Sequence, residues 1–166
     1  MFETGLKKLD QFLGGGIKEG LITDISGQNS TGKTQLAFQI CISALKNGKE
    51  ILFQDTTGEF RPERLVEMLK IRKLDPILLD KIKVGRITNS VQQSKYLSKI
   101  ATNDFSLIVI DNATDLFSFE YSKKEQSFEK HLAFMKYMQN LASIAINTKI
   151  PIVVTNIVRS FNEHEE

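Results

Sequence analysis

The stretch Gly27-Gln28-Asn29-Ser30-Thr31-Gly32-Lys33-Thr34 fits the phosphate-binding pattern G-x-x-x-x-G-K-[ST] at every fixed position. Residues 21–26 before it are predicted to form a short strand, and residues 33–46 a helix. Such a strand–loop–helix unit aims several backbone N–H groups and the positive end of the helix dipole at one anion. Lys33 can then reach the β- and γ-phosphates, and the Thr34 hydroxyl can coordinate Mg²⁺. The stretch therefore predicts that the protein binds a nucleoside triphosphate with magnesium.

Length and composition bound the possible classes of protein. The 166 residues suffice for one domain with a substantial core, expected to span residues 1–166. No apolar run reaches the 18 residues or more of a membrane span, and the N-terminus has no signal-peptide pattern, so a cytoplasmic protein is expected. The single Cys41 excludes an intramolecular disulfide and is expected to be a buried small side chain. The histidines, His131 and His164, lie too far apart in sequence to suggest a metal site.

Apolar runs and helical patterns alternate along the chain. Strands are expected at residues 21–26, 51–55, 82–84, 107–110 and 150–156. Helices are expected at residues 33–46, 62–72, 75–79, 89–101 and 127–147, and an apolar turn with glycine-rich bends at residues 1–20. The last helix carries one apolar face of Phe128, Leu132, Met135, Met138, Leu141 and Ala145. The alternation predicts an α/β fold with a mostly parallel sheet and helices on both faces.

A second nucleotide-binding signature lies at the end of the strand predicted at residues 107–110. This apolar strand is followed directly by Asp111, the kind of acid that holds Mg²⁺, usually through water. Ligands of parallel sheets lie at the carboxyl ends of the strands, so Asp111 is expected near the phosphate loop. Hydrolysis also needs a group that positions or deprotonates the attacking water, and no residue supplies it plainly.

Several runs resemble the RecA/RadA strand-exchange recombinases. The clearest is Asp55-Thr56-Thr57-Gly58-Glu59-Phe60-Arg61-Pro62-Glu63-Arg64, which is similar to their D-T-E-G-T-F-R-P-E-R segment. The phosphate loop running on into Gln35 resembles their G-K-T-Q. Residues 4–17, 107–117 and 150–158 are similar to three further family segments in the same order. The resemblance covers almost the whole chain, and the lack of a preceding helical domain favours archaeal RadB-type recombinase paralogues.

The resemblance implies a P-loop NTPase of RecA type that uses ATP and Mg²⁺. In this reading the strand order is 82–84, 51–55, 107–110, 150–156 and 21–26. Thr34 and Asp111 hold the metal, the latter through water, and Arg64 stacks on the adenine. The residues expected to contact the nucleotide around the loop are Gly27, Gln28, Asn29, Ser30, Thr31, Gly32, Lys33, Thr34 and Gln35.

Single-stranded DNA is a further partner that the resemblance implies. The first DNA-binding loop of the family falls at residues 121–127, which here lack the family's glycines and arginine. Lys123 and Lys124 are the candidate contacts, although phosphate affinity needs several such charges and two loop lysines are usually solvated surface. The net charge of +2 does not indicate nucleic-acid binding by itself.

The departures from the family pattern concern hydrolysis and assembly. Thr57 stands where the family has its catalytic glutamate, and a hydroxyl cannot act as the general base, which leaves Glu59 as the candidate catalytic residue beside Asp111. Ile157 replaces the glutamine that senses phosphate in the family. No F-x-x-A oligomerisation motif precedes the core. The chain ends on the acidic stretch 163–166, where the family's second DNA loop and later strands would begin. The strand at residues 21–26 is then expected to be an open edge that pairs with a second copy or another protein.

Three functions remain open on these grounds. The first is an ATP-binding accessory protein of homologous recombination and DNA repair, with slow or no hydrolysis and a recombinase or paralogue as partner, nucleoid-associated when bound to DNA. The second is an active DNA-dependent ATPase that uses Glu59. The third is a non-enzymatic interaction scaffold, which has no chemical need for Lys33, Thr34 and Asp111 together.

Overall fold

A computed structural model of the chain describes residues 1–100 and 104–158. It contains one five-stranded sheet, in which every pair of neighbouring strands is parallel. The strand order is β1-β5-β4-β2-β3, which confirms the expected order and the parallel sheet. The strands are β1 (Ile22–Gly27), β2 (Ile51–Asp55), β3 (Ile82–Arg86), β4 (Leu107–Asp111) and β5 (Ile152–Ile157).

The helices fall close to their expected positions. They are α1 (Lys7–Phe12), α2 (Lys33–Lys46), α3 (Pro62–Ile71), α4 (Ser90–Ile100), α5 (Asp115–Glu120) and α6 (Ser127–Thr148), with 3₁₀ helices η1 (Pro76–Lys81) and η2 (Lys124–Gln126). The side-chain oxygen of Asn89 accepts the N–H of Gln92 and caps the start of α4. The short helices α1 and α5 were not predicted, because six residues show too little of a 3.6-residue period.

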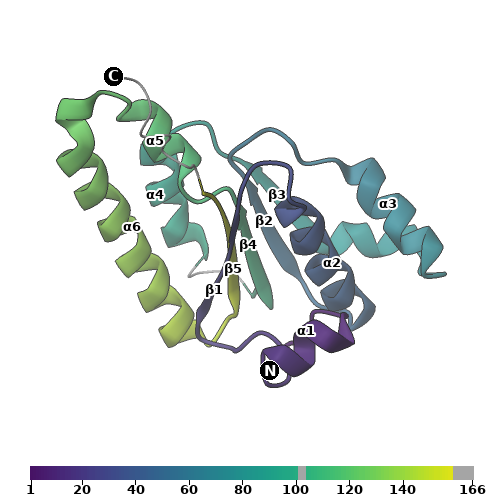
Figure 1. Cartoon of the computed structure of the whole chain (residues 1–166). Helices are drawn as coiled ribbons and strands as arrows, with labels where there is room; N and C mark the ends of the chain where they lie inside the picture. Colours follow the sequence, from purple (N-terminus) through teal and green to yellow (C-terminus); the bar gives the residue numbers. More distant parts are fainter. Residues whose placement is uncertain (101–103, 159–166) are drawn as a thin grey trace.

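Helices cover both faces of the sheet, as expected (Figure 1). On one face α2 packs on the sheet with α3 beside it, and the Phe38 ring of α2 lies 5.6 Å from the Phe53 ring of β2 between centroids. On the other face α4, α5 and α6 enclose a second apolar cluster that includes Ile110 and Leu141. Strands β2 and β4 are buried along their whole length, which is why they read as continuous apolar runs.

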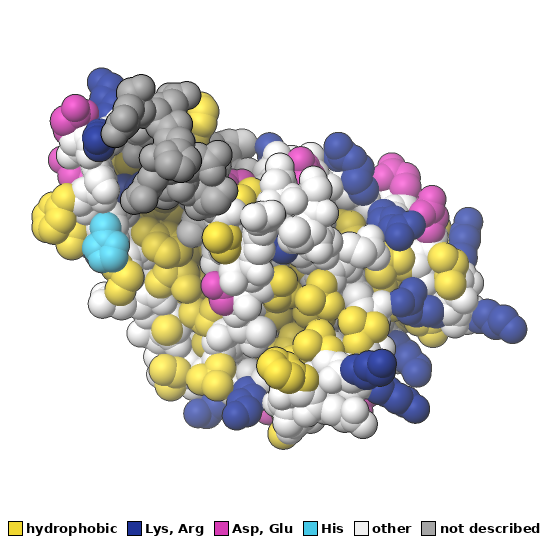
Figure 2. Space-filling model, viewed as in Figure 1, with side chains coloured by type: hydrophobic (Ala, Val, Ile, Leu, Met, Phe, Trp, Pro, Cys, Tyr) yellow, Lys and Arg dark blue, Asp and Glu magenta, His cyan; other side chains and the backbone are white. Residues whose placement is uncertain are grey.

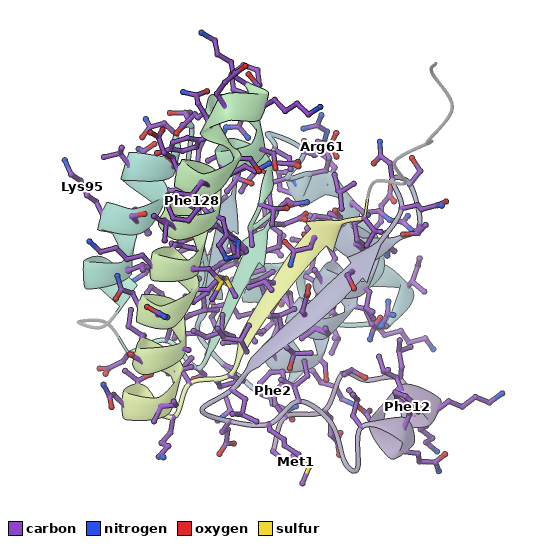
Figure 3. The ribbon with its side chains drawn as sticks, turned by 60° about the vertical axis from the view of Figure 1, so that its left-hand side comes forward. Met1, Phe2, Phe12, Arg61, Lys95 and Phe128 are labelled. Atoms are coloured by element: carbon purple, nitrogen blue, oxygen red, sulfur yellow. The ribbon has the colours of Figure 1, made fainter. Side chains whose placement is uncertain are left out.

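The apolar face predicted for α6 is only partly the buried one. Phe128, Leu132 and Met135 are exposed, whereas Tyr137 and Leu141 are buried against the sheet. Hydrophobic side chains therefore gather on the outer side of α6, where Phe128 projects (Figures 2 and 3). Because α6 is apolar on two opposite sides, its period could not show which side faces the core.

Three further expectations concerned the environment of Cys41, metal-binding clusters and membrane-spanning helices. Cys41 is buried and free, and its burial raises the pKa of the thiol, as expected for a packing residue. No group of three potential metal-ligating side chains occurs in residues 1–100 and 104–158. Residues 163–166, which include His164 and three glutamates, lie outside the described part of the chain. Among the described helices, none combines the length and apolar character that crossing a membrane requires.

Gln54 lies on the interior strand β2, with its side-chain amide buried and without a hydrogen-bond partner among the described residues. Gln54→Met is therefore expected to stabilise the protein by about 1–3 kcal/mol, because methionine has a similar shape and no polar atom to desolvate. Chemical denaturation measures the change in the free energy of unfolding. Gln93→Met is the matched control, expected to destabilise, because it removes the bond from the Gln93 amide to the Ala113 carbonyl, 3.1 Å long. A less stable Gln54→Met variant would contradict the prediction.

Strand β1 forms one end of the sheet, as the family resemblance implied. In the described part of the chain, only β5 pairs with it, and Leu21 just before it is half exposed. We expect the 166-residue chain to self-associate through this edge, because unpaired N–H and C=O groups are a template for another strand. Light scattering across a concentration series measures this association, and Leu21→Lys is expected to reduce it. A wild-type monomer at high concentration would rule the prediction out.

Candidate functional site

The phosphate loop joins β1 to α2 at the carboxyl end of the sheet. Gly32 has a φ of 89°, a left-handed conformation that glycine adopts without strain as the loop enters the helix. The Thr31 hydroxyl donates to the Gln28 carbonyl, 2.8 Å away, and closes the loop on itself. The Lys33 ammonium donates to the carbonyls of Gly27 and Gln28, at 3.1 and 2.7 Å. Among the described residues, its hydrogen-bond partners are these two backbone carbonyls, so the ammonium lies over the loop, where phosphate oxygens would compete for it.

Three side chains meet beside the loop. The Thr34 hydroxyl donates to one oxygen of the Asp111 carboxylate, 2.7 Å away. The hydroxyl of Thr155, in the second half of β5, donates to the other oxygen. Carboxylate and hydroxyl oxygens are the ligands that Mg²⁺ prefers, so this corner fits the metal. Thr155 was not assigned a role from the sequence, although its place at the end of an apolar strand was a usable signal.

A cavity of about 590 Å³ opens at this end of the sheet. Residues 29–35 of the loop line it, together with Glu59, Arg64, Asp111 and Ile157. Four segments that are distant in sequence therefore contribute to one hollow, as expected for a nucleotide site. Gln28 and Gly27 are not among its lining residues, but their carbonyls hold the Lys33 ammonium.

Arg64 lies at the edge of the cavity, with its side chain half exposed. Its Nε donates to the Gln35 amide oxygen, 3.1 Å away, and its Nη1 forms a 3.0 Å ion pair with Glu67. The Gln35 amide nitrogen contacts the Met68 sulfur at 3.1 Å. Gln35 therefore turns its side chain toward α3 and Arg64, and it orients a guanidinium that can stack on a planar ring.

The turn after β2 brings Thr57 and Glu59 to the same cavity. The Thr57 hydroxyl is bonded within the turn: it donates to the Asp55 carboxylate at 3.0 Å and accepts the Glu59 N–H at 3.2 Å. Glu59 is the carboxylate of this turn that lines the cavity, and Ile157 adds an apolar wall. The cavity thus combines a phosphate-loop motif with the Thr34–Asp111 pair, and it carries a hydroxyl at position 57.

The candidate DNA contacts lie apart from the cavity. Lys123 and Lys124 are exposed at the start of η2 and do not line the 590 Å³ hollow. A neighbouring cavity of about 460 Å³, lined in part by Ser122 and Lys130, shares Ile157 with it. The structure therefore does not bring the two lysines into the cavity that the phosphate loop lines.

Comparison with known proteins places these features in a family context. The Rad51 family model matches residues 1–165. The DNA repair and recombination protein RadB of Thermococcus gammatolerans is 38% identical over 164 residues, which cover 95% of this chain and 70% of that protein. RadB of Pyrococcus abyssi is 34% identical, with 97% of this chain and 72% of the relative covered. RadA of Cenarchaeum symbiosum is 35% identical over 96% of this chain, but the chain spans only 43% of that relative's length.

Proposed function

Since the chain belongs to the Rad51 family of recombination and repair proteins, we propose that it is an ATP-binding accessory protein of homologous recombination. In this role it binds ATP with Mg²⁺ and hydrolyses it slowly or not at all. Its partners are single-stranded DNA and a recombinase or paralogue protein. The support comes from the site's chemistry and from the relatives named as DNA repair and recombination proteins.

One observation supports the ATP-binding proposal above the others. The Lys33 ammonium and the hydrogen-bonded side chains of Thr34 and Asp111 line the same cavity. Lys33 supplies a cation and the loop supplies N–H donors for phosphate oxygens. Thr34, Asp111 and Thr155 supply the oxygens that would hold Mg²⁺, directly or through water. When bound, the metal would neutralise negative charge on the phosphates.

Two residues that line the cavity, Thr57 and Ile157, support the proposal of slow hydrolysis. A general base accelerates water attack by about 10²–10⁴-fold, and a threonine hydroxyl of high pKa cannot take that proton. In addition, the Thr57 hydroxyl already donates a hydrogen bond to the Asp55 carboxylate within the turn. Ile157 lines the cavity without a hydrogen-bonding group that could report the γ-phosphate.

An active DNA-dependent ATPase is the second candidate, and one observation favours it. Glu59 lines the cavity and belongs to the same turn as Thr57, so its carboxylate is the available substitute base. Its backbone N–H is bonded to the Thr57 hydroxyl, which ties the two residues into one local unit. The two candidates differ in turnover and agree on ATP binding.

The test of the proposed function compares ATP affinity with turnover, with and without single-stranded DNA. Calorimetry gives the affinity for ATP·Mg²⁺, and phosphate release gives the turnover rate. Binding with slow turnover in both conditions supports the accessory protein. Brisk turnover that DNA stimulates would favour the ATPase, and no binding at all would favour the scaffold.

A further inference from the structure

The carboxylate of Asp55 organises the turn that follows β2. It accepts the backbone N–H groups of Thr57, Gly58 and Phe60, at 3.0, 2.7 and 3.4 Å, as well as the Thr57 hydroxyl. We call residues 56–60 the Asp55 turn. One carboxylate thus provides most of the polar contacts that hold this turn in shape.

Arg86, the last residue of the edge strand β3, pairs with that carboxylate. Its Nη1 lies 3.1 Å from the second oxygen of Asp55. The Asp55 side chain is only 6% exposed and the Arg86 side chain 50%, so the arginine connects a buried charge to the surface. A buried carboxylate without a charged partner is costly, and the ion pair therefore supports the conformation of the turn.

The guanidinium of Arg86 also packs directly on the turn. Gly58 has a φ of 81°, and a Cβ atom there would lie 2.6 Å from both Nη1 and Nη2 of Arg86. Only a residue without a side chain permits this approach. Arg86 therefore fixes the turn by charge and by contact together.

The Asp55 turn presents its side chains to the candidate nucleotide site. Thr57 and Glu59 line the 590 Å³ cavity, whereas Arg86 does not. Arg61, just after the turn, donates to the carbonyls of Gly58 and Phe60 and also lines the cavity. Figure 3 shows Arg61 at the end of the molecule toward which the strands run.

We propose that Arg86 is a positioning residue for the nucleotide site, acting through Asp55 on the turn that presents Thr57 and Glu59 to the triphosphate. The inference rests on the proposed function in one respect, that the cavity holds ATP. The arginine does not touch the nucleotide. It fixes the position of the turn, and through the turn the positions of the Thr57 and Glu59 side chains.

Hydrogen exchange of the nucleotide-free protein tests the first step. Arg86→Gln is expected to speed exchange of the Thr57 and Gly58 amides by about tenfold or more, with the amides of β2 and β4 unchanged. Arg86→Lys keeps the charge and should restore most of the protection. Lys83→Gln, which removes the same charge from the same strand away from Asp55, is the control. Unchanged turn amides in Arg86→Gln, or a uniform rise that includes β2, would overturn the inference.

Kinetics of the Thr57→Glu protein test the second step. Adding Arg86→Gln is expected to lower kcat by about tenfold while ATP affinity changes by less than about threefold, because the arginine orients the turn without binding the ligand. Faster exchange with no change in kcat would refute the link to the site. The exchange experiment needs no nucleotide, so it still decides the role of Arg86 in the turn if the wild-type protein binds no ATP.

Discussion

Lys33→Ala is expected to weaken ATP·Mg²⁺ binding by about 100-fold or more. The substitution removes the only cation bonded over the phosphate loop in the described part of the chain, and each charge-assisted hydrogen bond to phosphate contributes about 1.5–3 kcal/mol. Calorimetric titration of both proteins with ATP·Mg²⁺ measures the loss. The fold should persist, because the hydrogen bonds of Lys33 to described residues go to carbonyls of the loop itself.

Lys46→Ala is the matched control for this prediction. Lys46 lies in the last turn of the same helix, is exposed, and does not line the 590 Å³ cavity. Its removal changes the net charge by the same amount and should leave ATP affinity within about twofold, since exposed charges at this distance are screened. Equal affinity of the Lys33→Ala variant and the wild type would refute the assignment of the phosphate site.

Thr57→Glu is expected to raise ATP turnover by up to about 10²–10⁴-fold, the usual contribution of a general base. The new carboxylate would project from a turn that already lines the cavity, near the phosphate loop and Asp111. The gain should appear in kcat rather than in ATP affinity, because a base acts on the attacking water in the transition state. Phosphate release under saturating ATP measures it.

Thr57→Gln is the control that separates the base from the loss of the hydroxyl. It removes the same bonds to Asp55 and to the Glu59 N–H, but it supplies no proton acceptor of suitable pKa. Turnover of this variant should stay at the wild-type level or below. A wild-type enzyme with brisk turnover that Glu59→Gln abolishes would contradict the prediction and assign the base to Glu59.

The parts of the fold that the sequence predicted are those controlled by local pattern. The phosphate-loop motif predicted where α2 (Lys33–Lys46) begins. The continuous apolar runs predicted the buried strands β2 and β4. The resemblance supplied the strand order, which no local pattern contains.

The parts that the sequence could not predict depend on contacts between distant segments. The outward position of Phe128 on α6 depends on which of the two apolar sides of the helix meets the sheet. The Asp55–Arg86 ion pair joins residues on separate strands. No sequence motif at either residue predicts that the two side chains meet. The side chain of Gln35 faces Arg64 because α3 packs beside α2, a tertiary arrangement that the G-K-T-Q run does not encode.

The most direct test of slow hydrolysis at an ATP site is the fate of ATP bound to the wild-type protein in a single turnover. Excess protein is mixed with labelled ATP·Mg²⁺, with and without single-stranded DNA, and the bound nucleotide is recovered over time. The prediction is that the label binds and is recovered as ATP over many minutes, because the hydroxyl of Thr57 cannot take a proton from the attacking water. Failure of the label to bind, or its rapid conversion to ADP, would contradict it.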